Sequence, residues 1–163
     1  MGCGKSTVGW ALAGALGVQF VDLDERIAQS LGASIPEIFA RRGEAAFRRE
    51  ETRQLRAVGG LERVVVATGG GTYCSEANRR LIRESGGVAV FLELPWEVLL
   101  SRLPGRNADR PKFRDPSAAQ QLYERRLPDY RTADVLLQLD GSESVDQVAR
   151  RILSQVEGMP CGT

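Results

Sequence analysis

The sequence predicts an α/β fold in which a parallel β-sheet is covered on both faces by helices. Short apolar runs of the length expected for buried strands recur along the chain. Segments with helical spacing of their apolar residues lie between these runs. Strands that alternate with helices pair in parallel, because each helical crossover returns the chain to the same edge of the sheet. The length of 163 residues fits one compact domain.

The predicted elements begin at the first residues. Apolar residues at helical spacing between 6 and 16, followed by the stop signal Gly17, predict a helix that leads into a strand at 18–21. Ser34 and Pro36 are the capping and first-turn residues expected at the start of a later helix. Further strands are predicted at 64–67, 88–92 and 135–139. Further helices are predicted at 24–31, 34–41, 44–58, 75–84, 95–103, 117–127 and 144–156.

Two stretches interrupt the alternation of strands and helices. Several helices fall between 24 and 59, where one crossover would suffice, so we expect this segment to be an inserted module that holds a substrate. The stretch 104–116 is rich in Arg, Pro, Asn and Asp, which predicts a mobile surface loop. We assign both to a single domain that spans 1–163.

Composition excludes several classes of function. A net charge of +1 argues against a general nucleic-acid binder. No run approaches the roughly 20 apolar residues of a membrane span, and no signal segment is visible, so we expect a cytoplasmic protein that does not bind membranes. The three cysteines lack metal-ligand spacing, and the absence of histidine removes Ser-His-Asp and Cys-His catalysis. Any chemistry must use carboxylates, Lys, Arg, backbone amides and a bound ion.

The first residues form the second half of a phosphate-binding loop. In the motif G-x-x-x-x-G-K-[ST], backbone amides surround phosphates, the Lys reaches the β and γ oxygens, and the hydroxyl binds Mg²⁺. The alternative is a Gly-rich tail that precedes a helix by chance. The matching residues are Gly2, Cys3, Gly4, Lys5, Ser6 and Thr7.

The first glycine of that motif, and the strand that feeds the loop, would lie before Met1. This strand is central in a P-loop sheet, so its loss would leave the neighbouring strands with unpaired backbone groups. Each buried unpaired group costs about 1 to 3 kcal/mol, against a domain stability of about 5 to 15 kcal/mol. We therefore expect that Met1 is an internal residue of a longer protein. An in-frame upstream segment encoding several apolar residues and a Gly would support this, and an upstream stop codon without one would contradict it.

Two further segments follow strands, at the edge where open α/β sheets bind ligands. Asp22 and Asp24 flank Leu23, so they point the same way. Asp22 is a candidate to hold Mg²⁺ through water, and Asp24 to bind and deprotonate a substrate hydroxyl; the alternative is that Asp24 caps a helix and Asp22 faces solvent. The glycines at 69–71 let a ligand approach bare backbone amides, whereas an ordinary turn needs only one glycine.

Arginines offer candidate anion contacts in three places. Within 47–51, a solvated charged helix face is the alternative to a functional role. In the loop 104–116, Arg110, and less strongly Arg106, are candidates to close over transferring phosphates. Near the end, an arginine at 125, 126 or 131 is a candidate to bind a carboxylate with both nitrogens, although most of this cluster also fits a helix surface.

Taken in order, these motifs resemble the shikimate kinase family. They are G-K-S-T, D-x-D after a strand, F-R-x-x-E, G-G-G after the next strand, R-P in the loop and Y-R near the end. The resemblance extends from Met1 to about Val156, and the order and spacing are more specific than any single motif after the phosphate loop. It implies a three-layer P-loop kinase fold with a five-stranded parallel sheet, of which the first, central strand is missing here.

The resemblance implies phosphorylation of the 3-hydroxyl of shikimate by ATP with Mg²⁺, in the biosynthesis of chorismate and aromatic amino acids. It assigns the catalytic roles to Lys5, Asp24 and Arg110. It assigns ATP binding to Gly2, Cys3, Gly4, Lys5, Ser6, Thr7 and Arg110, and the metal to Ser6 and Asp22. It assigns shikimate binding to Asp24, Arg48, Glu51, Gly69, Gly70, Gly71 and Arg131, with Arg48 and Arg131 as the clamp for the carboxylate.

Two rival interpretations stay open at this point. One is another small-molecule kinase of the same architecture, for gluconate or a nucleoside monophosphate. Two clamp arginines and Asp24 favour a hydroxylated carboxylate over a nucleotide. The other is a binding relic without turnover, which becomes the leading interpretation if Met1 is the true start. We expect a monomer.

Overall fold

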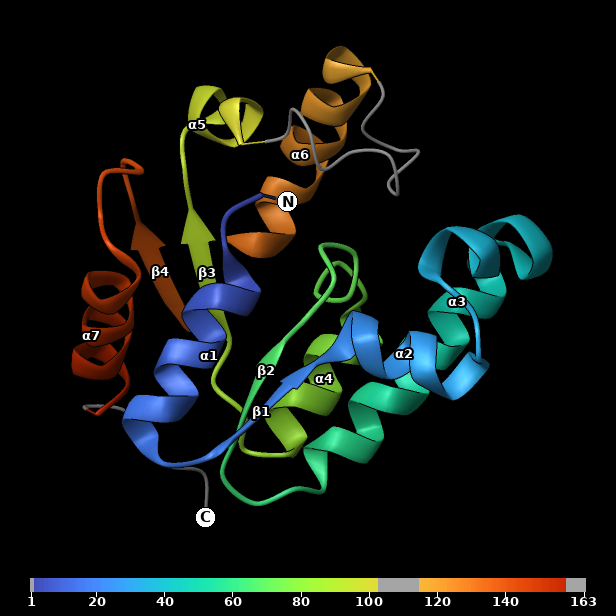
Figure 1. The fold of residues 1–163 in the computed structure, drawn as a ribbon, viewed down its shortest axis with the longest axis horizontal. Helices are drawn as coiled ribbons and strands as arrows, with labels where there is room; N and C mark the ends of the chain where they lie inside the picture. The colour runs from blue at the N-terminus through green and yellow to red at the C-terminus, as the bar shows by residue number, and fades with distance from the viewer. Residues whose placement is uncertain (1, 103–114, 158–163) are drawn as a thin grey trace.

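The chain folds into two pairs of parallel strands flanked by helices (Figure 1). The computed structural model describes residues 2–102 and 115–157. The strands are β1 (Gln19–Asp22), β2 (Val64–Ala67), β3 (Val90–Glu93) and β4 (Val135–Gln138). The helices are α1 (Lys5–Leu16), α2 (Leu23–Leu31), α3 (Ile35–Gly59), α4 (Glu76–Glu84), α5 (Trp96–Ser101), α6 (Pro116–Tyr130) and α7 (Val145–Val156).

The helix ends follow from local capping chemistry. Ser34 and Glu37 form a capping box at the start of α3, which confirms the predicted cap. The Ser75 hydroxyl caps α4 by accepting a hydrogen bond from the backbone amide of Asn78. The helices expected at 34–41 and 44–58 are joined in α3, where Gly43 adopts φ 74° and ψ 169° and kinks the helix. Glycine tolerates this backbone conformation, so the boundary predicted between the two helices is present as a kink within α3.

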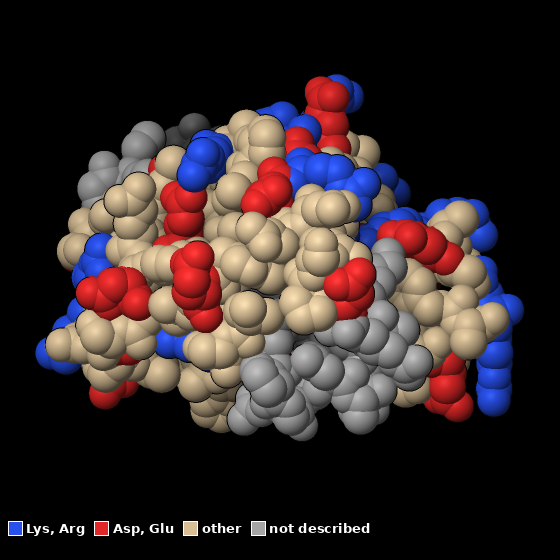
Figure 2. All heavy atoms as spheres, turned by 90° about the horizontal axis from the view of Figure 1, so that it is seen from above, with Lys and Arg blue, Asp and Glu red and all other residues tan. Residues whose placement is uncertain are grey.

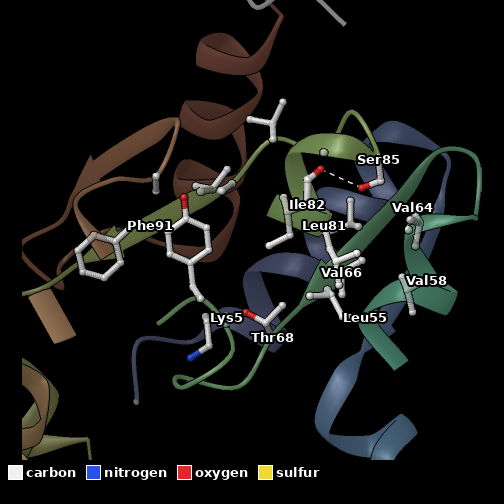
Figure 3. A pocket seen from close by; sticks show the side chains of 18 of the residues that line it. Lys5, Leu55, Val58, Val64, Val66, Thr68, Leu81, Ile82, Ser85 and Phe91 are labelled. Atoms are coloured by element: carbon white, nitrogen blue, oxygen red, sulfur yellow. Dashed lines mark hydrogen bonds between the residues drawn. The ribbon is translucent and has the colours of Figure 1, made fainter. Parts of the chain in front are cut away.

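The strands form two parallel pairs with a gap between them, and the predicted loss of a central strand would leave such a gap. β1 pairs with β2, with Val21 opposite Val66, and β3 pairs with β4, with Leu92 opposite Leu137. A cavity of about 860 Å³ separates β2 from β3 and is lined by residues of both strands (Figure 3). The two strands remain apart because no described segment lies between them to accept hydrogen bonds from both edges. The strand expected before Met1 stays a prediction.

Helices cover both faces of the strands and enclose two apolar cores. Figure 1 shows α1 and α4 on opposite faces, and α1 packs against α7 and against β1 and β2. α2 packs against α3, which also contacts α4. One core lies around β3 and β4 and includes Leu92, Leu99 and Leu137. The other lies between β1, α2 and α3 and includes Leu23 and Ile27, which are fully buried.

This arrangement brings several segments to one edge of the strands. The strands within each pair are parallel, so their carboxyl ends share an edge. β1 ends at Asp22 and β3 at Glu93, while β2 leads directly into the turn 68–75. Figure 2 views the molecule from this side and shows basic and acidic side chains close together. Open α/β sheets bind ligands at this edge.

Glu50 links α3 to α2 and gives a prediction for acid stability. Its carboxylate accepts hydrogen bonds from Arg53 (2.6 Å), Gln54 (2.7 Å) and Ser30 (2.8 Å), and these bonds, that of Arg53 first, lower the pKa of Glu50 from 4.5 to about 2. Folding therefore favours the charged form, so this stabilisation is complete above pH 4.5 and disappears towards pH 2.

We expect Glu50→Gln to lower the free energy of unfolding by about 1 kcal/mol at pH 7, a figure that allows for the solvent exposure of Arg53. The loss should shrink as the pH falls from 4.5 towards 2. Urea unfolding at pH 7 and pH 3 measures both values, with the exposed Glu62→Gln as control. An equal loss at both pH values would contradict the prediction.

Candidate active site

The phosphate-binding loop ends at the amino terminus of α1. Gly4 adopts a left-handed conformation (φ 80°) and caps the helix, and its carbonyl accepts the first helical hydrogen bond from Val8. The Lys5 ammonium lies 3.7 Å from the Cys3 thiol. Burial alone would raise the pKa of Cys3, but the Lys5 charge, the amino terminus and hydrogen bonds from Lys5 leave it lowered. A helix amino terminus beside a lysine is suited to hold an anion.

Ser6 and Asp22 meet at the start of α1. The Ser6 hydroxyl donates a hydrogen bond of 2.6 Å to Oδ2 of Asp22. The other oxygen, Oδ1, accepts from the backbone amides of Asp24 (3.0 Å) and Glu25 (3.4 Å), so Asp22 caps α2. The alternative in which Asp24 caps the helix is therefore wrong. A hydroxyl and a carboxylate at this separation are oxygen ligands of the kind that Mg²⁺ prefers, so the pair fits such an ion.

The glycine turn at 69–71 lies against Asp24 on one side and Arg48 on the other. A Cβ atom on Gly69 would lie 2.8 Å from Oδ1 of Asp24. A Cβ atom on Gly71 would lie 2.6 Å from Cζ of Arg48. Both glycines thus allow a charged side chain to approach the backbone, and three of the predicted segments come together here.

Arg48 is held in place by acidic side chains of α3. Its Nη1 donates to both carboxylate oxygens of Glu51 (3.0 and 2.8 Å), and its Nη2 donates to Glu44 (3.1 Å). Burial alone would lower the pKa of Arg48, but these bonds raise it above the usual value. The guanidinium also lies 5.2 Å from the centre of the Phe47 ring. The position of Arg48 is therefore fixed before any ligand binds, and Glu51 is buried beneath it.

Two buried polar residues that sequence reasoning missed support the glycine turn. The Thr72 hydroxyl donates to Glu51 (2.7 Å), and the Thr72 carbonyl accepts from the Asn78 amide (3.0 Å). The exposed fractions of Thr72 and Asn78 are 0% and 1%, so each needs its partners. Thr72 directly follows the three glycines, so its place in the sequence could have identified it as part of the turn. Asn78 lies inside the predicted helix 75–84, where nothing distinguishes it from a surface residue.

The end of α6 contacts the glycine turn from another side. The Tyr130 hydroxyl donates a hydrogen bond to the carbonyl of Gly70, and burial raises the pKa of Tyr130 to about 12. Arg131 is not brought to Arg48 by any contact of the described residues. Instead, its guanidinium pairs with Glu93 at the end of β3 (2.6 Å). Its role in a carboxylate clamp stays a prediction.

Two of the predicted candidates cannot be placed. Arg106 and Arg110 lie outside the described residues, as does most of the loop predicted at 104–116. The placed residues nevertheless line one edge with an anion-binding loop, an oxygen pair and a polar turn flanked by a carboxylate and a guanidinium. Within 2–102 and 115–157, no helix is long and apolar enough to cross a membrane. The phosphate-binding loop, the Ser6–Asp22 pair and the glycine turn together can hold a phosphate group beside a hydroxylated acid.

Comparisons with known proteins agree on one family. The family model described as "Shikimate kinase" matches residues 1–157. The chain is 43% identical to the shikimate kinase of Ruegeria pomeroyi, over 94% of this chain and 80% of that protein. It is 44% identical to the shikimate kinase of Geobacter sulfurreducens, over 96% of this chain and 86% of that protein.

Solved structures give the same result for the fold. The shikimate kinase of Acinetobacter baumannii in complex with shikimate superposes with a TM-score of 0.89 at 34% identity, covering 96% of this chain and 88% of that one. A gluconokinase of Sinorhizobium meliloti is less similar, with a TM-score of 0.59 at 26% identity, covering 96% of this chain and 87% of that one. The arrangement of strands and helices is thus that of a P-loop kinase.

Proposed function

The chain belongs to the shikimate kinase family, and we propose that it transfers the γ-phosphate of ATP to the 3-hydroxyl of shikimate, giving shikimate 3-phosphate and ADP. This reaction is a step in the biosynthesis of chorismate and aromatic amino acids. The observation that carries the proposal for this chain is the placement of Asp24 and Arg48 on either side of the glycine turn. A hydroxylated carboxylate needs one acceptor and one cation, and this pair supplies both.

On the nucleotide side, the loop 2–7 holds the phosphates of ATP. Its backbone amides and the amino terminus of α1 bind phosphate oxygens, and Lys5 neutralises charge on the β and γ groups. Ser6 and Asp22 would hold Mg²⁺, which would neutralise charge on the phosphates. Arg110, which lies outside the described residues, is the arginine that we propose to neutralise charge on the transferring phosphate.

On the acceptor side, Asp24 binds the substrate hydroxyls and takes the proton of the attacking one. Arg48 binds the carboxylate, supported by Glu51, while the amides of Gly69, Gly70 and Gly71 approach the ring. Arg131 would complete the clamp after leaving Glu93. Phosphoryl transfer depends mainly on positioning and charge neutralisation, which these groups provide. We further propose a cytoplasmic monomer whose partners are ATP and shikimate.

An assay of ATP consumption with shikimate as the acceptor tests the function directly. The 163-residue chain is measured beside the same chain preceded by five apolar residues, a glycine and one further residue, because the phosphate-loop motif places its first glycine two positions before Met1. Turnover of shikimate by either protein supports the function. Turnover of gluconate instead, or ATP binding without any turnover in both folded proteins, would favour the rival kinase or the binding relic.

Arg48→Ala separates the acceptor side from the nucleotide side. We expect the KM for shikimate to rise about 30-fold and the KM for ATP to change less than about twofold, because only the carboxylate loses a charged partner. Steady-state kinetics with each substrate varied in turn measures this ratio. Arg41→Ala, an exposed arginine of the same helix, is the matched control. Equal rises in both KM values would show that Arg48 does not bind the carboxylate of shikimate.

A further inference from the structure

A buried asparagine joins the glycine turn to the helix that carries Arg48. Asn78 lies in the first turn of α4 and is 1% exposed. Its Nδ2 donates to the Thr72 carbonyl (3.0 Å), and its Oδ1 accepts from the Thr52 hydroxyl of α3 (2.8 Å). Both ends of the amide are therefore used, one on the turn and one on α3. Only a side chain with a donor and an acceptor on the same group can bridge these two partners.

A second connection runs parallel to the first. The Thr72 hydroxyl donates to Glu51 (2.7 Å), and Glu51 in turn accepts from Arg48. Glu51 and Thr52 are neighbours in the chain, so both connections start from one turn of α3 and end on Thr72. Asn78 holds the backbone of Thr72, and Glu51 holds its side chain. Together they fix how far the glycine turn lies from the Arg48 guanidinium.

We infer that Asn78 is a positioning residue for shikimate, which sets the separation between Arg48 and the backbone amides of 69–71 without touching the substrate. The inference rests on the proposed function. A carboxylated ring held between a guanidinium and a glycine turn requires both at a fixed distance, and an error of about 1 Å in such a site can cost about 100-fold in rate. A role confined to folding would instead lower stability and leave the affinity for shikimate unchanged.

Asn78→Asp tests this inference with the smallest change of shape. A carboxylate still accepts from Thr52 but cannot donate to the Thr72 carbonyl, so the turn should move away from α4. We expect the dissociation constant for shikimate, measured by calorimetry, to rise about tenfold and that for ATP to change less than about twofold. The control is Gln54→Glu, the same amide-to-acid change at a buried residue of α3 whose partners are Arg26 and Glu50. It should weaken neither ligand.

Thr52→Val and Thr52→Ser keep the test decisive if Asn78→Asp does not fold. Thr52→Val removes the hydroxyl that orients Asn78 and should weaken shikimate binding a few-fold, whereas Thr52→Ser should restore it. Unchanged affinity in Asn78→Asp and Thr52→Val, or an equal loss for ATP and shikimate, would overturn the inference. If neither the 163-residue chain nor its extended form phosphorylates shikimate, the proposed function itself is wrong, and the inference falls with it.

Discussion

Lys5→Met is expected to lower kcat for shikimate phosphorylation by about 1,000-fold. Lys5 is the cation of the loop that opens α1, and the charge on the β and γ phosphates grows towards the transition state. Methionine keeps an unbranched stem and removes only the ammonium group. The melting temperature should stay within about 2 °C, since a half-exposed lysine contributes little to stability.

Steady-state kinetics and a thermal melt on the same preparation measure both parts of this prediction. Arg83→Met, which removes an exposed cation from the last turn of α4, is the control and should leave kcat unchanged. A fall in kcat of less than about tenfold would mean that Lys5 does not neutralise the transferring phosphate.

Gly71→Ala should raise the KM for shikimate by about 10- to 100-fold. The added methyl group would occupy the place of the Arg48 guanidinium, with its carbon 2.6 Å from Cζ. Gly71 does not adopt a positive φ, so its backbone accepts an alanine. The guanidinium at the end of the Arg48 side chain would be forced out of its place instead, which breaks its bonds to Glu51.

A double-mutant cycle shows whether the effect acts through Arg48. In an Arg48→Ala background, Gly71→Ala should have little further effect on the KM for shikimate, because the displaced group is already gone. Gly14→Ala, on an exposed face of α1 where a Cβ atom meets nothing within 4 Å, is the control for the same chemical change. Additive effects of Gly71→Ala and Arg48→Ala would show that Gly71 acts by another route.

Much of the fold follows from local signals in the sequence. The strand predicted at 64–67 coincides with β2, and the strand predicted at 18–21 is displaced from β1 by one residue, because apolar runs bounded by turns are strong signals. The sequence does predict a gap in the sheet, because the phosphate-loop motif places a central strand before Met1, but the pairing of the strands could not be predicted from the runs. It depends on which edges find a hydrogen-bonding partner, and that is a property of the whole arrangement.

The candidate site also has residues whose proximity the sequence predicts and residues whose contacts it does not. Ser6, Asp22 and the glycine turn belong to motifs tied to strand and helix ends, so their proximity at one edge follows from parallel topology. Arg48 lies in a motif that also fits a surface helix. Only its contacts with Gly71 and Glu51 distinguish a functional arginine from one on a solvated helix face. Asn78 and the pairing of Arg131 with Glu93 depend on contacts between distant segments, for which one sequence contains no signal.

The separation of the two strand pairs has a consequence for how the protein unfolds. Each pair has its own apolar core, one around Leu137 and one around Ile27, and no ladder of backbone hydrogen bonds joins the described strands of one pair to those of the other. Helix α1, which packs against α7 and against β1 and β2, therefore couples the half with Asp24 and Arg48 to the half with β3 and β4 in place of a continuous sheet. Shikimate bound at the acceptor site would then protect backbone amides in the half with Asp24 and Arg48 from hydrogen exchange more than amides in the half with β3 and β4.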